Sequence, residues 1–519
     1  MRRTLIVGLF STLALIAGQI LPAQAQAQSS GNWLQWGRTA QHNGDSPAVG
    51  QNPQVQLADI TFDPFVVQEQ AEAGGPLTAH YQVPLIDGDT TFLEYKTGVY
   101  ISCDPPGSHM PYPCGPDAWD WEIWNERAFS WQNGSLVEKW NFQSDWKPEP
   151  NSNVNDVNIS WGLLGWEPVF HAAASDGNVF VPGASGSVYK LNEGDGSVAE
   201  HFTPFGSDPN TYISGPLTAD ANGNVYYSAM RLDPTLPWTT DATGAWLVKI
   251  APDGAFRVAK YETLVPGAQV SCFGTLPCGS QRGAINVGPA ISPDGKTLYT
   301  VSRSHLLPYV TYLVAVNVSD LTPQWHVKLV GLLSKNNVNF ADDQSSSTPS
   351  VAPDGSIFFG ALDFDASTTG RGVLLKFSPD GQYLAAFNFG WDETPAIYPH
   401  DGTYSLIIKN NYYATDGPYY ISQLDSNLRP EWHFKNDTID ATHPFGYEWC
   451  VNAPAVDANG TVYANSEDGN VYVINQGGTL KGKIFERQAI EAAYTPIAIG
   501  PDGLLYTEND GDMFVVGNQ

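Results

Sequence analysis

Apolar and polar residues repeat in the same order along most of the chain. Each copy starts with a proline after a small or polar residue and continues with an alternating apolar strand. A turn, usually of Asp-Gly or Asn-Gly type, follows, and then a strand that often holds Tyr or Phe. Alternation with a period of two predicts half-buried strands, and these dipeptides supply the positive φ that tight hairpin turns require. The marker prolines are Pro84, Pro168, Pro216, Pro289, Pro349, Pro395, Pro454 and Pro496, and the matching turns are Asp87-Gly88, Asp176-Gly177, Asn222-Gly223, Asp294-Gly295, Asp354-Gly355, Asp401-Gly402, Asn459-Gly460 and Asp502-Gly503.

A second hairpin follows the first in most copies, so each unit holds about four strands. The segments 186–202, 245–261, 372–389 and 469–485 have this pattern, and several outer strands carry a tryptophan, as at Trp140, Trp325 and Trp432. Successive marker prolines from Pro168 onward lie 42 to 73 residues apart. Four strands in about 40–50 residues are typical of a β-propeller blade, and the longer intervals predict inserted loops.

The two ends of the chain together predict a closed ring. After Pro496 only enough chain remains for two strands, whereas the apolar segment 54–62 precedes the first full unit. That segment can supply the missing outer strand, which would remove an exposed sheet edge. We therefore predict an all-β fold, a single β-propeller of eight four-stranded antiparallel blades, with seven blades as the alternative if the Pro84 unit is degenerate. Insertions are expected near 98–127 and 266–285.

The N-terminus has the features of a secretory signal peptide. Arg2 and Arg3 precede the apolar segment Leu5–Ile20, and small residues offer cleavage sites ending at Ala25 or Ala27. The apolar segment is too short for a comfortable membrane span, and no later stretch has 18 consecutive apolar residues. We expect Sec-type export from a bacterial cell, removal of residues 1–27, and a propeller domain over 28–519 in the periplasm or the medium.

Five cysteines fit an oxidising compartment. Cys103 and Cys114 flank one short loop, and Cys272 and Cys278 flank another, so each pair is suited to a local disulfide. Cys450 remains, and we expect a buried, inert thiol because no adjacent His or Lys would activate it.

The charge balance excludes some classes of partner. The chain has 25 Lys and Arg against 54 Asp and Glu, a formal net charge of −29. A surface this negative repels nucleic acid and anionic lipid, so we expect neither as a partner. The lack of a long apolar segment after the N-terminus leads us to expect no membrane span. We expect a monomer.

The repeats resemble those of the PQQ-like family, the quinoprotein-alcohol-dehydrogenase-like propellers. The segment "WGRTAQHNG" (36–44) is similar to the Trp-x7-Gly opening that often precedes the first blade in that family, and the Asp-Gly-x-Val-Tyr and Gly-x-x-x-Trp-x-Phe elements are similar to its repeat signature. The resemblance covers nearly the whole mature chain and implies the propeller fold.

The same family includes quinone-dependent dehydrogenases and non-enzymatic scaffolds, such as an outer-membrane assembly factor. Its enzymes typically carry adjacent cysteines, a Glu/Asn/Asp calcium set and a catalytic Asp. This chain has no Cys-Cys pair, no Cys-x-x-Cys-His haem motif and no lipidated cysteine near the cleavage site. The resemblance therefore raises PQQ and Ca²⁺ as cofactors without assigning residues to them, and propellers host unrelated activities.

The residues just before each marker proline should line one mouth of the central channel. They bring carboxylates, aromatic rings, one Arg and one His toward one axis, a combination that suits a ligand pocket. Carboxylates there could serve acid–base chemistry, hold a divalent cation or bind sugar hydroxyls. No His-x-x-x-His pair indicates a zinc site. The candidates are Trp161, Glu167, Arg282, Asn286, Asp343, Trp391, Glu393, His443, Glu448 and Glu491, of which Arg282 is either an ion-pair strut or an anion hook.

These observations favour a secreted, non-catalytic propeller that binds a protein partner, a small molecule or a carbohydrate. The alternative is an enzyme that uses the channel mouth, either a PQQ-dependent oxidoreductase or a carbohydrate-active hydrolase or lyase. The sequence leaves catalysis open.

Overall fold

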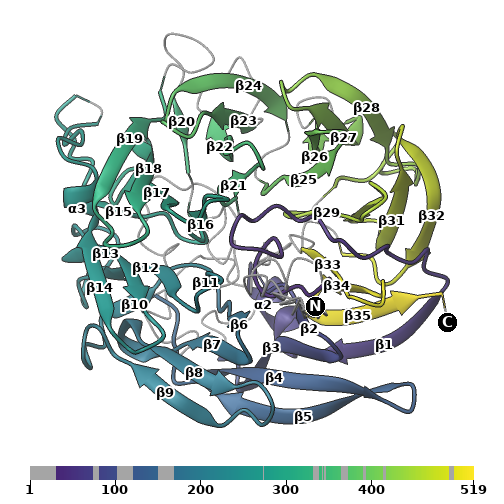
Figure 1. The fold of residues 1–519 in the computed structure, drawn as a ribbon, viewed down its shortest axis with the longest axis horizontal. Coiled ribbons are helices and arrows are strands. Elements are labelled where there is room, and N and C mark those ends of the chain that lie inside the picture. Colours follow the sequence, from purple (N-terminus) through teal and green to yellow (C-terminus); the bar gives the residue numbers. More distant parts are fainter. Residues whose placement is uncertain are drawn as a thin grey trace, which may run out of the picture.

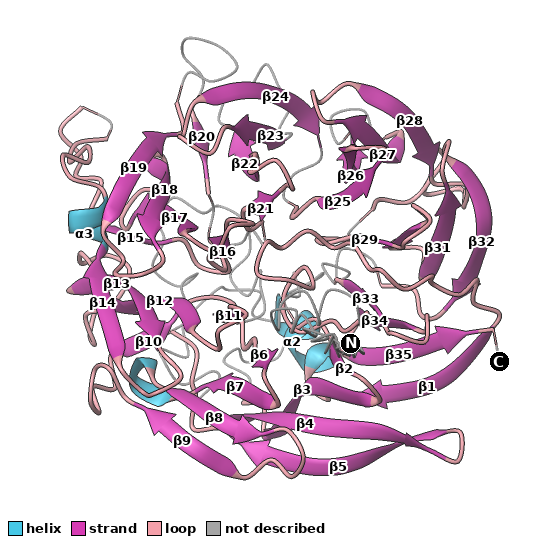
Figure 2. Ribbon diagram, in the orientation of Figure 1, coloured by secondary structure: helices cyan, strands magenta, loops and turns pink. Residues whose placement is uncertain are grey.

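The chain forms eight four-stranded antiparallel blades around a central channel, as predicted (Figure 1). The computed structural model describes residues 31–73, 81–101, 121–149, 169–272, 274–330, 338–341, 343, 347–363, 372–389, 393–412, 417–449, 451–489 and 496–518. Strands dominate these residues (Figure 2). The helical segments with assigned bounds are α2 (Val66–Ala73), η3 (Ala184–Gly186) and α3 (Tyr261–Leu264).

The first four blades follow one another along the chain. Blade 1 comprises β2 (Leu85–Asp87), β3 (Thr90–Gly98), β4 (Glu122–Gln132) and β5 (Ser135–Gln143), and blade 2 comprises β6 (Ala173–Ser175), β7 (Asn178–Pro182), β8 (Val188–Asn192) and β9 (Val198–Phe202). Blade 3 comprises β10 (Thr211–Ile213), β11 (Thr218–Ala219), β12 (Val225–Arg231), β13 (Gly244–Ile250) and β14 (Phe256–Lys260), and blade 4 comprises β15 (Gln281–Gly283), β16 (Ala290–Ile291), β17 (Thr297–Ser304), β18 (Thr311–Asn317) and β19 (Pro323–Lys328).

The remaining blades complete the ring. Blade 5 comprises β20 (Asn339–Phe340), β21 (Ser350–Val351), β22 (Ile357–Asp363), β23 (Gly372–Phe377) and β24 (Tyr383–Phe389), and blade 6 comprises β25 (Ala396–His400), β26 (Thr403–Asn411), β27 (Tyr419–Asp425) and β28 (Pro430–Lys435). Blade 7 comprises β29 (Ala455–Val456), β30 (Val462–Asn465), β31 (Asn470–Asn475) and β32 (Thr479–Phe485), and blade 8 comprises β33 (Ile497–Ile499), β34 (Leu505–Asn509), β35 (Asp512–Gly517) and β1 (Val55–Thr61).

The N-terminal strand closes the ring. β1 pairs antiparallel with β35, from Val55 opposite Gly517 to Thr61 opposite Asp512. It lies within the predicted segment 54–62, so that prediction is confirmed. Closure joins the two ends of the chain and leaves blade 8 with the same number of strands as its neighbours.

The two faces of the ring differ in their connections. The Asp-Gly and Asn-Gly hairpins join the first and second strands of each blade on one face, which we call the turn face. The connections from second to third strands and from blade to blade lie on the other, which we call the mouth face. Both predicted insertions belong to the mouth face, and they are shorter than expected because β4 begins at Glu122 and β15 occupies Gln281–Gly283.

The innermost strand is interrupted in blades 3, 4 and 5. There, two short strands pair with opposite ends of the same second strand, as β15 and β16 do with β17. The marker prolines Pro216, Pro289 and Pro349 lie in the interruptions, where a residue without a backbone N–H is tolerated. The break separates a mouth half, which carries Arg282, from a turn-face half.

The segment that precedes β1 fills the channel near the turn face. The amides of Ile86, Ala174, Ile291, Val351, Ile397 and Val456, on the inner strands of six blades, donate to the carbonyls of Trp33, Leu34, Ala40, Gln41, Asn43 and Gly44 at 2.6 to 3.0 Å. In blade 3, Ala219 N donates instead to the side chain of Gln35, at 2.8 Å from Oε1. In Figure 1 this purple stretch crosses the middle of the ring. The segment therefore bonds to seven blades and satisfies amides that would otherwise face an open channel.

Two buried histidines near the channel segment, His42 within it and His171 outside it, are uncharged. His42 is fully buried, with Nε2 3.3 Å from Thr218 Oγ1 and Nδ1 3.0 Å from Thr348 Oγ1. Burial lowers the pKa of His42 to about 3 and that of His171 to about 4, so both imidazoles are uncharged at neutral pH. The hydrophobic core lies between blades, and its largest cluster includes Leu93, Val179 and Phe514 from three neighbouring blades.

Candidate functional site

The structure brings three of the predicted site residues together. Arg282, Asn286 and Asp343 meet between blades 4 and 5 at the mouth. Glu393 precedes β25, and His443 and Glu448 lie in the connection between β28 and β29. Outside the described residues lie Trp161, Glu167, Trp391 and Glu491, together with Cys103, Cys114 and Cys450.

Asp343 is the centre of the cluster between blades 4 and 5, which we call the arginine cluster. Arg282 donates to both of its oxygens, from Nη1 at 3.0 Å and from Nη2 at 2.5 Å. Arg303 approaches the same carboxylate at 2.8 Å from β17. The two arginines are directly opposite in the β15–β17 register, so two like charges are buried side by side with Asp343 between them. Arg282 is therefore an ion-pair strut rather than an open anion hook.

The charges in the arginine cluster are fixed. Burial alone would raise the pKa of Asp343, but attraction to Arg282 and Arg303 outweighs it and lowers the pKa to about 2. Glu149, in the segment after blade 1, behaves in the opposite way because burial raises its pKa to about 7, with a further rise from Asp343. His305 accepts from Arg282 Nε at 3.1 Å and stacks on Trp238, and burial with the nearby guanidinium lowers its pKa to about 4.

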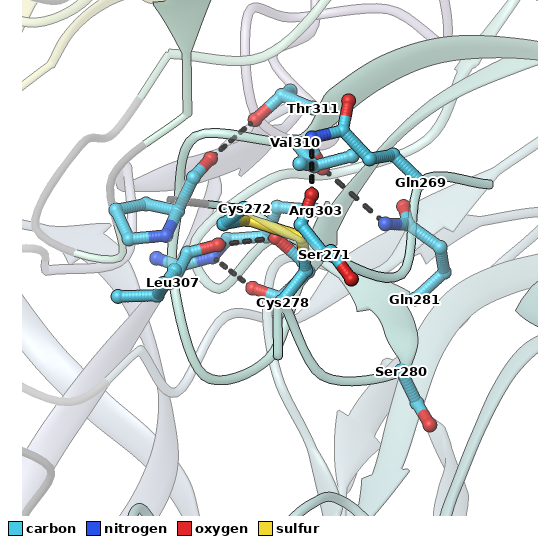
Figure 3. Close-up of a disulfide and its surroundings, with 12 residues drawn as sticks. Gln269, Ser271, Cys272, Cys278, Ser280, Gln281, Arg303, Leu307, Val310 and Thr311 are labelled. Atoms are coloured by element: carbon cyan, nitrogen blue, oxygen red, sulfur yellow. Dashed lines mark hydrogen bonds between the residues drawn. A yellow bond between two sulfur atoms is a disulfide. The ribbon is translucent and has the colours of Figure 1, made fainter. Parts of the chain in front are cut away.

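A disulfide supports this side of the mouth. Cys272 and Cys278 are bonded with their Cα atoms 5.1 Å apart, which confirms the predicted pair (Figure 3). The Cys278 carbonyl accepts from the amides of Leu306 and Leu307 at 3.0 and 3.2 Å, just after β17 ends. The loop thereby joins the approach to β15 with the end of β17, the two strands that carry the arginines.

The other described candidates are held by local hydrogen bonds. Both carboxylate oxygens of Glu393 accept from the Lys409 amide, at 2.9 and 2.8 Å, so this side chain ties the connection to β26. Glu448 Oε1 accepts from Asn411 Nδ2 at 3.4 Å. His443 stacks on Tyr447 with ring centroids 3.8 Å apart, and its Nδ1 lies 3.1 Å from Asp440 Oδ1.

A second charged group lies across the mouth, on blade 1, and we call it the carboxyl cluster. Lys96 Nζ on β3 lies 2.9 Å from Asp63, 3.5 Å from Glu69 on α2 and 3.6 Å from Glu122 on β4. The four side chains are at most 3% exposed. Burial raises the pKa of Glu122 to about 9, because the attraction of Lys96 is opposed by Glu69 and Asp63. One ammonium thus serves two carboxylates, and Glu122 keeps its proton.

Two further acids extend the carboxyl cluster along β3 and β4. Gln82 N donates to Glu94 Oε2 at 3.0 Å, and Gln82 Nε2 donates to Glu126 Oε1 at 2.9 Å. Burial raises the pKa of Glu126 to about 8 and that of Glu94 well above its usual range. Burial thus favours the neutral form of both acids.

The carboxyl cluster and Arg303 were not among the predicted site residues. Those predictions covered the residues just before each marker proline, whereas Lys96 and Arg303 lie near the mouth ends of second strands and Glu122 lies on β4. A usable pattern was present, because "TFLEYKTG" (91–98) and "LYTVSRS" (298–304) place charged residues in strands that are otherwise buried. Charged side chains are rarely buried unless they are paired, so such positions predict a polar site.

Comparisons with known proteins agree on the fold. No family model matches the chain, and no curated protein sequence matches it. Among solved structures, the chain is similar to a europium-containing methanol dehydrogenase, with 11% identity, 93% of this chain and 90% of that chain covered, and a TM-score of 0.56. It is also similar to the quinohemoprotein alcohol dehydrogenase from Comamonas testosteroni, with 11% identity, 96% and 83% covered, and a TM-score of 0.56.

BamB from Moraxella catarrhalis is a further match, with 13% identity, 82% of this chain and 98% of that chain covered, and a TM-score of 0.43. The likeness is one of fold. At these identities it says nothing of the activity of this chain.

The described residues do not fit the cofactor set that the resemblance implied. PQQ carries several carboxylates and needs cations to hold them, but both guanidinium groups of the arginine cluster bind Asp343. The described residues also contain no group of three His, Cys, Asp or Glu placed to hold a metal ion. We therefore propose no reaction that uses PQQ.

Proposed function

We propose that this protein is an exported binding or scaffold protein that contacts a partner protein through its mouth face. The single observation that carries the proposal is where the exposed apolar side chains lie. Among the described residues of the mouth-face connections, large hydrophobic side chains are 38% to 78% exposed, namely Val67, Val99, Ile101, Trp121, Leu236, Val270, Leu276, Val330, Tyr412, Ile439 and Phe445.

The turn face has a different composition. The other large hydrophobic side chains that are exposed in the described residues lie on outer strands, spread over six blades, except Val49, which lies near the turns. Exposed apolar side chains gathered on one face mark an interaction surface, whereas single ones scattered over a surface are ordinary. The channel segment occupies the turn-face end, which further favours the mouth face as the surface for a partner.

Export remains part of the proposal. The N-terminal pattern supports it, and the Cys272–Cys278 disulfide is typical of proteins folded outside the cytoplasm. No described helix is long and apolar enough to cross a membrane.

Affinity capture with matched variants tests the proposed function. The mature protein, immobilised and exposed to envelope and medium fractions of its source, should enrich one defined protein. The variant V270S/L276S/I439S/F445S should lose that protein, because it removes anchors from the mouth face. The control V137S/L384S, on outer strands, should keep it. Binding that is equal for all three baits, or absent from all, would contradict the proposal.

The captured protein is then purified and its affinity for each bait measured by calorimetry. This step separates direct contact from co-purification. Loss of affinity in the mouth-face variant alone is the expected result.

A further inference from the structure

Asparagine is followed by glycine at four places in the chain, and this dipeptide is chemically labile. The backbone nitrogen of the glycine can attack the asparagine side chain, because glycine has no side chain of its own to block the approach. The reaction needs a glycine amide that is not held in a hydrogen bond, and room for the asparagine side chain to move. The four dipeptides are Asn43-Gly44, Asn133-Gly134, Asn222-Gly223 and Asn459-Gly460.

Three of the four glycine amides are held by the fold. Each donates to a backbone carbonyl at 2.8 to 2.9 Å, namely Gly44 to Gly37, Gly223 to Asp220 and Gly460 to Asp457. The same three glycines are buried. Attack on the neighbouring asparagine therefore requires that a hydrogen bond is broken and the turn is opened first.

The Asn133-Gly134 turn differs in both respects. It joins β4 to β5, where Gln132 pairs with Ser135 across a two-residue loop, and all four residues are exposed. Among the described residues, the Gly134 amide has no hydrogen-bond partner. A Cβ placed on Gly134 would meet no atom within 4 Å, so the glycine is surrounded by open space. In Figure 1 this hairpin ends at the outer edge of the ring.

The hairpin itself requires this labile pair at its tip. Asn133 has a φ of 53° and Gly134 a φ of 80°, so both central residues of the loop lie in the left-handed region. Asn followed by Gly is the preferred sequence for such a turn, because these two residues adopt positive φ most readily. The sequence that makes the tight turn is therefore also the sequence that exposes a reactive amide.

We propose that Asn133 is a site of spontaneous deamidation in the folded protein. The Gly134 nitrogen forms a bond to Asn133 Cγ, and the side-chain nitrogen leaves as ammonia, which closes a succinimide ring. Water then opens the ring at either of its carbonyl groups and gives aspartate or isoaspartate at position 133. The reaction consumes only water and involves no oxidation or reduction. It does not rest on the proposed function.

The products would change the end of the hairpin. Each adds one negative charge, and isoaspartate also runs the chain through its side chain, which inserts one carbon atom into the backbone of the loop. Loop length sets the register of a hairpin, so the pairing of Gln132 with Ser135 should weaken. We expect faster hydrogen exchange at the loop ends of β4 and β5 in aged protein, and unchanged exchange in blade 5.

Peptide mapping by mass spectrometry tests the site on the full mature protein incubated at pH 8. Conversion at Asn133 should be at least about fivefold faster than at Asn43, Asn222 or Asn459, since each of the other three amides must first give up one hydrogen bond. The same chain unfolded in urea is the control, because all four asparagines precede glycine and should then react at similar rates. G134A should slow conversion at position 133 alone, because its methyl group hinders the attacking nitrogen.

The wild-type comparison decides the case where G134A fails to fold. Conversion at Asn222 or Asn459 that matches Asn133 in the folded protein would overturn the proposal, because the hydrogen bonds of those turns would then give no protection. A folded protein that keeps Asn133 intact while the unfolded chain converts it would also overturn the proposal, because the hairpin would then protect its own tip.

Discussion

The carboxyl cluster and the arginine cluster lie on opposite sides of the same mouth, and both bury acids almost completely. In the arginine cluster, two guanidinium groups share one carboxylate, and the pKa of Asp343 falls to about 2. In the carboxyl cluster, one ammonium serves Asp63 and Glu69, while Glu122 and Glu126 keep their protons because their pKa values rise to about 9 and 8.

The two clusters show that a buried acid is charged only where enough cations are buried beside it. Burial favours the neutral form on both sides, and only a close opposite charge reverses that preference. The arginine side is therefore an ionic strut, whereas on the carboxyl side Glu122 and Glu126 stay neutral beside one ion-paired lysine.

The largest expected effect comes from breaking the strut. D343N leaves Arg282 and Arg303 opposite each other and buried without a counter-ion, so the free energy of unfolding should fall by about 3–5 kcal/mol. Chemical denaturation measures it. D437N is the matched control, because Asp437 pairs with Lys483 at the surface and its loss should cost about 0.5 kcal/mol. Equal losses for the two variants would show that Asp343 is not the counter-ion of the buried pair.

The next largest effect is expected on the carboxyl side. K96M keeps most of the side-chain volume but leaves Asp63 and Glu69 without their cation, and it should cost about 3 kcal/mol. K139M, in the same blade, is the control, because Lys139 is exposed and donates to Thr90 Oγ1 at 3.0 Å. A loss no greater than that of K139M would contradict the ion-pair arrangement around Lys96.

The pH dependence of stability separates the two clusters further. Glu126 has a folded pKa of about 8, whereas an unfolded Glu titrates near 4.3, so the folded state binds the extra proton between these values. Stability that is full below about pH 4.3 is lost as pH rises toward 8, by roughly 1.4 kcal/mol per pH unit for each such group.

Thermal unfolding from pH 5 to pH 9 checks this expectation. The melting temperature should fall with rising pH, and E126Q should flatten the profile by an amount on the order of 2–4 kcal/mol between pH 5 and 8. Asp343 has the opposite sign, since its stabilisation is present above about pH 3.9 and is lost as pH falls toward 2. A melting temperature that rises toward pH 9 would exclude the neutral acids.

The smallest effect is expected from the disulfide. Its short loop, with a sequence separation of 6, constrains the unfolded chain only modestly, so C272S/C278S should cost about 2 kcal/mol. Because the loop supports β15 and β17, the double variant should also increase hydrogen exchange at Gln281–Gly283. Blade 1 amides should be unaffected. A change spread evenly over both sides would show that the loop does not specifically support the arginine cluster.

The repeats could be predicted because local chemistry determines them. The Asp-Gly and Asn-Gly turns and the alternation around them predicted eight blades and the closing strand β1. The site could be predicted only in part. Arg282, Asn286 and Asp343 were found because each lies near a marker proline, but their pairing with Arg303 depends on cross-strand register.

Other features depend on contacts between distant parts of the chain. No periodicity in residues 33–44 indicates that they fill the channel, since their hydrogen bonds go to the inner strands of seven different blades. Likewise, the charge of Glu122 depends on burial and on where Lys96 lies relative to Glu69 and Asp63. No pattern within a single strand contains that information.

Infrared spectroscopy of the folded protein tests whether the buried acids of blade 1 keep their protons at pH 7. Neutral and ionised carboxyl groups absorb at different frequencies, so the spectrum at pH 7 reports how many acids keep their protons. We expect a band of protonated carboxyl groups at pH 7 that loses one group's intensity in E126Q, is unchanged in D343N that remains folded, and weakens as the pH rises through 8 and 9. Absence of that band in the wild-type protein at pH 7 would contradict the account.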